Sequence, residues 1–101
     1  MTYYFTVGLN DKETKTQLIS SEVAEILIAD YIANNFEGGT IFPCKGVYKH
    51  ENGQTVKENT FMIMLANISR EDALNTAEAF KAMFNQESIG ILPVDAEMAF
   101  I

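Results

Sequence analysis

Apolar and polar side chains alternate along residues 3–9, and a period of two residues predicts a β-strand. The polar residues 10–13 that follow are typical of a turn. A helix is expected next, because Ser20 or Ser21 is a good N-cap and Glu22 suits the positive end of a helix dipole. Apolar residues then recur at helical spacing: Val23, Ile26, Leu27 and Ile32.

Glycines 38 and 39 predict that this helix ends near Phe36, since glycine adopts the left-handed conformation without steric cost. Two strands follow, at about 40–50 and 55–66, and Asn52–Gly53 between them is a strong signal for a two-residue hairpin turn. If these two residues form the turn, the register is fixed. It sets Tyr48 opposite Lys57, Val47 opposite Glu58 and Cys44 opposite Phe61.

The last third of the chain predicts a second helix and a fourth strand. Residues 69–72 resemble a capping box, and apolar residues follow on one helical stripe: Ala73, Ala77, Phe80 and Phe84. The final strand is expected from near Ile89 to Ile101, bent at Pro93. The order strand, helix, strand, strand, helix, strand predicts one domain over residues 1–101. Its class is α+β, a ferredoxin-like β-α-β-β-α-β sandwich with two helices on one face of a four-stranded antiparallel sheet.

The third predicted strand is apolar on both faces, because residues 61–65 read Phe-Met-Ile-Met-Leu. Two helices cover only one face of a four-stranded sheet. We therefore expect the other face, which carries Met62 and Met64, to pack against a second copy and form a homodimer. The alternative is that residues 95–101 fold over that face.

Composition narrows the classes of partner. Fourteen acidic against seven basic residues give a formal charge of -7, which argues against general nucleic-acid binding and against anionic membrane surfaces. This charge fits a free cytoplasmic protein or one that presents an acidic face to a basic protein partner. A small molecule is the other candidate partner. No signal peptide or membrane-spanning run is recognisable, so a cytoplasmic location is expected. A single cysteine and a single histidine, Cys44 and His50, make no zinc motif, and we expect no metal and no cofactor.

Four segments of the second half resemble a small bacterial family of uncharacterised proteins: residues 36–40, 46–48, 53–58 and 84–89. Strand 4–9 is also similar. The tail differs from the family, and the chain is more acidic. The resemblance implies a compact α+β fold and no particular reaction.

Glu58 is the first catalytic candidate. A carboxylate inside an apolar strand can have a raised pKa and act as an acid or base. In the predicted register, Lys45 and Lys49 are its diagonal neighbours, so the structural interpretation is a surface ion pair. Tyr48 and Gln86 are the other catalytic candidates.

Gln86, Glu87 and Ser88 lie between the second helix and the last strand, and with Tyr48 they are the candidate ligand-binding residues. Structurally they form a helix C-terminal turn. Cys44 shares a predicted face with Phe42 and Phe61, which is typical of a small buried hydrophobic residue.

Three functions remain, of which the third is an assembly subunit whose role is the interface itself. The first is a binding module without catalysis, for a small ligand or a protein partner, of the kind that phages and mobile elements encode. The second is a cofactor-independent enzyme of the dimeric α+β-barrel type that uses Glu58 as its acid or base.

Overall fold

A computed structural model describes residues 1–49 and 51–101 of the chain. The elements are β1 (Thr2–Gly8), α1 (Ser21–Asn35), β2 (Thr40–Lys49), β3 (Thr55–Leu65), α2 (Arg70–Met83) and β4 (Gly90–Val94). The sheet is antiparallel with the order β2-β3-β1-β4, which confirms the predicted ferredoxin-like sandwich. Pro43 and Pro93 lie in the two edge strands, where a missing N–H group is tolerated. Neither helix is both long and apolar enough to cross a bilayer in the residues described.

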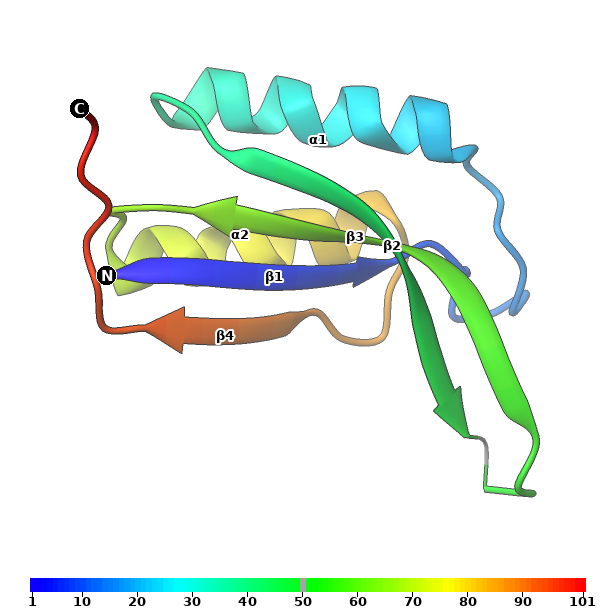
Figure 1. Ribbon diagram of the computed structural model, residues 1–101. Helices are drawn as coiled ribbons and strands as arrows, with labels where there is room; N and C mark the ends of the chain where they lie inside the picture. The colour runs from blue at the N-terminus through cyan, green and yellow to red at the C-terminus, as the bar shows by residue number, and fades with distance from the viewer. Residues whose placement is uncertain (50) are drawn as a thin grey trace.

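One apolar core joins both helices to one face of the sheet (Figure 1). Phe80 of α2 is fully buried. The centroid of its ring lies 6.2 Å from that of Phe5 in β1 and 5.3 Å from that of Tyr31 in α1, and both ring pairs are edge-to-face. The stripe predicted for α2 is confirmed, because Ala73, Ala77, Phe80 and Phe84 are all buried. The opposite face of the sheet therefore has no helix.

The buried face of α1 agrees only in part with the expected one, since Ile32 is buried and Leu27 packs against the core as predicted. Ala24, Ile28 and Ile32 are buried, whereas Val23 and Ile26 are 48% and 59% exposed. Apolar residues surround most of this helix, so their spacing does not single out a face. Packing on the sheet selects the side that fits.

The two glycines after α1 have a different role from the one predicted. Ser20 caps the start of the helix by accepting a hydrogen bond from the Val23 N–H. At the other end, Phe36 turns into extended backbone at φ −138°, and neither glycine adopts a positive φ. Gly39 is required by close approach instead, because a β-carbon there would lie 2.6 Å from Leu65 Cδ2.

The hairpin register is shifted by one residue from the predicted one. Lys49 pairs with Thr55, Gly46 with Glu58 and Cys44 with Thr60. A type I′ turn needs positive φ at both central residues, but here only Gly53 has it (84°), and the Asn52 side chain accepts from the Gln54 N–H. Since side chains alternate along a strand, this shift moves every β2 side chain to the opposite face.

The shift changes what the helix-free face, called the open face below, presents. Met62 and Met64 are on it, half-buried, together with Phe42, Cys44 and Tyr48 of β2. Cys44 is exposed, opposite Thr60, so the prediction of a buried cysteine beside Phe61 is wrong. Figure 1 shows the far half of the β2–β3 hairpin projecting beyond both helices.

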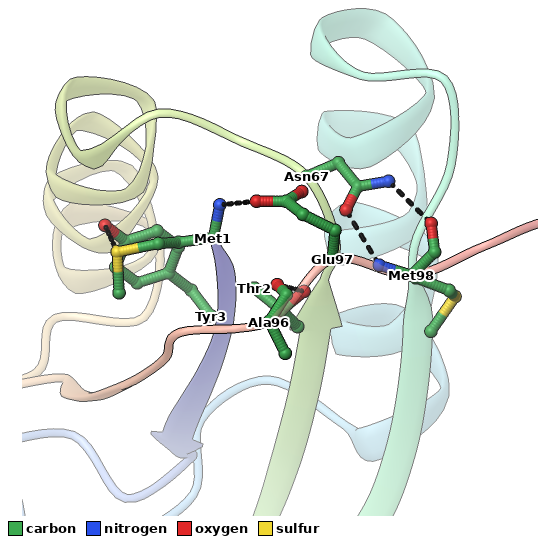
Figure 2. Close-up of polar contacts among 7 residues, drawn as sticks. All are labelled: Met1, Thr2, Tyr3, Asn67, Ala96, Glu97 and Met98. Carbon is green, nitrogen blue, oxygen red and sulfur yellow. Dashed lines mark hydrogen bonds and ion pairs between the residues drawn. The ribbon is translucent and has the colours of Figure 1, made fainter.

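The C-terminal tail lies against the end of the sheet and not along it. β4 ends at Val94, short of the predicted Ile101. Figure 2 shows how the tail is held: Thr2 Oγ1 donates to the Ala96 carbonyl, and the Asn67 amide both donates to and accepts from the Met98 backbone. The tail leaves the open face uncovered, since Leu92 and Phe42 are 62% and 42% exposed there.

Candidate functional site

The Glu58 carboxylate lies on the open face, above a gap that two glycines leave in the neighbouring strands. Glu58 of β3 pairs with Gly46 of β2, and its side chain leans over Gly8 of β1. A β-carbon at Gly8 would be 2.6 Å from Glu58 Cδ, and closer still to Oε1. The Asn10 N–H donates to Glu58 Oε2 at 2.9 Å. The carboxylate is therefore held in one position by a backbone donor and by the absence of a side chain beneath it.

The ion pair expected between Glu58 and the β2 lysines does not form. Lys45 and Lys49 alternate with Gly46 and so belong to the opposite face, and the Lys45 ammonium donates to the Asn59 side chain. Among the residues described, the single ion pair joins the Met1 amino group and Glu97, at 2.5 Å. Glu58 therefore forms no ion pair with a lysine or arginine in the part of the chain that the structure describes.

Tyr48 also lies on the open face of the sheet. It is two residues nearer the hairpin turn than Gly46, the residue that pairs with Glu58. Desolvation raises the pKa of the Tyr48 phenol, and the charge of Glu58 raises this pKa further. Both causes favour the protonated phenol. A hydroxyl donor and a carboxylate are thus combined on one side of the sheet.

Gln86 lies behind the Glu58 carboxylate and bonds to the backbone of the chain. It is only 8% exposed, and its Nε2 donates to the carbonyl of Asn10 at 2.7 Å and to that of Phe84 at 3.2 Å. Asn10 is the residue whose N–H holds Glu58. Gln86 therefore holds the Asn10 loop, and this loop in turn holds Glu58. Glu87 and Ser88 are exposed in the connection to β4.

The loop after β1 contributes more than the sequence indicated. Asp11 accepts hydrogen bonds from the Asn85 side chain at 2.8 Å and from the N–H groups of Glu13 and Thr14. These bonds, that of Asn85 first, lower the pKa of Asp11. Residues 10–13 predicted only a turn, because Asn85 is 74 positions away from Asp11 in the chain. Asp11 and the Asn85–Gln86 pair form no sequence motif that would indicate this contact.

One hollow lies on the open face and a second lies beyond the end of the sheet. The smaller, about 340 Å³, is beside the gap that Glu58 covers, on β1 and β4. The larger, about 780 Å³, lies at the opposite end of the sheet between the α1–β2 connection, the start of α2 and the tail. Within residues 1–49 and 51–101, no three His, Cys, Asp or Glu side chains gather as metal ligands. His50 lies outside the described residues.

The fold places the chain among small ferredoxin-like α+β proteins, and the open face of its sheet carries the Glu58 carboxylate. The chain belongs to a family described as a protein of unknown function, DUF3574, whose model matches residues 2–100. This finding confirms the resemblance to an uncharacterised family. Among curated proteins none matches the sequence.

The solved structures that are similar to the chain include the following three. A phage SAM lyase in the apo state shares 25% identity with the chain, over 89% of this chain and 75% of that one, with a TM-score of 0.58. A phage SAM lyase in complex with S-methyl-5′-thioadenosine shares 26%, over 89% and 76%, at a TM-score of 0.56. A divalent cation tolerance protein (Cut A1) from Thermus thermophilus is 17% identical, over 97% and 88%, at a TM-score of 0.63, and this likeness shows the fold alone.

Proposed function

We propose that this protein binds S-adenosylmethionine on the open face and cleaves it to S-methyl-5′-thioadenosine. The observation that carries the proposal is the Glu58 carboxylate, which is held over Gly8 by the Asn10 N–H and pairs with no lysine among the residues described. It is a site for a cation. The likeness to phage SAM lyases, at 25% and 26% identity over 89% of the chain, supports a sulfonium nucleoside as that cation.

The reaction needs no further reactant. The bond between the sulfonium sulfur and the γ-carbon of the methionine part breaks, and the sulfur keeps the electron pair and becomes a neutral thioether. The γ-carbon accepts an oxygen of the substrate's own carboxylate, which closes a lactone. No proton is gained or lost, so the protein has to bind, orient and exclude water.

Glu58 would serve as the partner of the substrate's α-ammonium group. A charge-assisted hydrogen bond between them leaves the substrate carboxylate free to curl toward the γ-carbon. The ammonium keeps its charge throughout the reaction, so this contact persists into the transition state. Glu58 thus orients the substrate, which replaces the acid or base role that the sequence suggested for it.

Incubation of the purified protein with S-adenosylmethionine tests the proposal. We expect S-methyl-5′-thioadenosine and the lactone to appear in equal amounts, at a rate proportional to protein concentration. Chromatography with mass detection measures both products, and a reaction without protein corrects for spontaneous decay. If the substrate binds in calorimetry but decays only at the uncatalysed rate, the protein is a binding module without catalysis.

A second copy on the open face would close this site. Strands β1 and β3 pair over six residues, about 20 Å, and the four strands are about 4.8 Å apart, so two copies that meet on this face would bury on the order of 800 Å² in total. That is a small interface, which the projecting β2–β3 hairpin would have to enlarge. Leu92, Phe42 and Tyr48 are exposed on the open face. We expect a homodimer by light scattering at micromolar concentration, and Leu92→Glu should shift it toward the monomer. A wild-type monomer at that concentration contradicts the homodimer.

A further inference from the structure

The smaller hollow has the lining of a site for a flat ring. It opens on the open face and is lined by the side chains of Tyr4, Thr6, Met62 and Leu92 and by Gly90. Ile91 belongs to the lining through its backbone, since its side chain packs against the core on the other face. Aromatic rings and thioethers are polarisable surfaces on which planar heterocycles pack. The Thr6 hydroxyl and the Tyr4 phenol are the polar side-chain groups within this lining.

Gly90 keeps the hollow open. It pairs with Thr6 across β1 and β4, and a β-carbon at this position would collide with Thr6 Oγ1. Any side chain here would displace the hydroxyl or project into the hollow. The missing side chain therefore gives a ligand access to Thr6 and to the strand backbone.

The hollow and the Glu58 carboxylate are neighbours along one strand. Tyr4, Thr6 and Gly8 are successive residues on the open face of β1, and Glu58 lies over the last of them. Two residues along a strand span about 7 Å, which matches the length of one ribose between a base and its 5′ substituent. A nucleoside in the hollow can therefore place its 5′ sulfur beside Glu58.

We infer that the hollow formed by Tyr4, Thr6, Met62, Gly90 and Leu92 binds the base and ribose of the nucleoside, with the 5′ sulfur directed toward Glu58. This inference rests on the proposed function and names its nucleoside subsite. The base packs between Tyr4 and Met62, and Leu92 forms the outer wall.

Binding of S-methyl-5′-thioadenosine, an uncharged nucleoside, isolates this subsite from Glu58. Calorimetry should show about fivefold weaker binding to Leu92→Ala, because part of an apolar wall is lost. Leu74→Ala is the matched control, since Leu74 is also exposed but lies on α2. Glu58→Gln should leave the Kd within about twofold, because this ligand has no charge.

NMR of methyl-labelled methionine gives a second readout that does not depend on a variant. Ring currents of the bound base should shift the Met62 methyl signal, while that of Met83, packed against the core on α2, stays in place. No binding to the wild type, equal binding by the two leucine variants, or an unmoved Met62 signal would each overturn the subsite.

The failure of the subsite and that of the proposed function are distinguishable. If the wild type cleaves S-adenosylmethionine and Leu92→Ala has an unchanged KM, the nucleoside binds elsewhere and the lyase proposal stands. If nothing is cleaved but S-methyl-5′-thioadenosine binding depends on Leu92, the subsite stands without the lyase.

Discussion

Glu58→Gln is expected to lower kcat/KM for S-adenosylmethionine about 100-fold, which corresponds to about 2.7 kcal/mol of lost transition-state stabilisation. The amide keeps the size of the side chain but removes the charge that pairs with the substrate ammonium. KM should rise because the cation loses its partner, and kcat should fall because the substrate carboxylate is no longer directed at the γ-carbon. Initial rates over a range of substrate concentrations separate the two effects.

Glu87→Gln is the matched control for this variant. It makes the same chemical change at an exposed residue in the connection to β4, and we expect wild-type kinetics from it. Thermal melting should show that both variants fold. Wild-type kcat/KM in Glu58→Gln would remove Glu58 from the site and with it the observation on which the proposed function rests.

Gly8→Ala is expected to lower kcat/KM for S-adenosylmethionine by a similar factor, about 100-fold, although it removes no charged group. The added β-carbon would lie 2.6 Å from Glu58 Cδ and 2.8 Å from Glu58 Oε2, so the carboxylate has to move away from the Asn10 N–H. The variant tests the position of the charge and not its presence.

Gly38→Ala is the control for the added methyl group, because nothing lies within 4 Å of a β-carbon there. It should keep wild-type rates. The double variant Gly8→Ala/Glu58→Gln should be no worse than Glu58→Gln alone, since both changes act on one contact. Equal activity of the two glycine variants, or additive losses in the double variant, would show that Gly8 does not act through Glu58.

The elements of the fold follow from local patterns. The alternation in residues 3–9, the serine caps at positions 20 and 69 and the stripe from Ala73 to Phe84 predict β1, α1 and α2 nearly to their ends. The order of these elements gives the topology, and the two prolines agree with the edge strands. Such features depend on neighbours in the chain, so one sequence is enough to read them.

The candidate site was predicted only in part. The sequence indicates three candidates, Glu58, Tyr48 and Gln86. Their residue types and their spacing in the chain do not show how the three side chains are arranged in space. The predicted register placed Glu58 opposite Val47 and beside two lysines, whereas Gly46 is its partner. The contribution of Asn10 could not be seen, because its N–H meets Glu58 across 48 positions of the chain.

The sequence by itself determined the six elements, their order and a third strand that is apolar on both faces. The tertiary structure decided which side of α1 is buried, which face each β2 residue occupies and what surrounds Glu58. The physical reason is the range of the interactions. Capping and periodicity act within a few residues, whereas a one-residue shift at the hairpin and a missing side chain at Gly8 act between strands that meet only in the folded sheet.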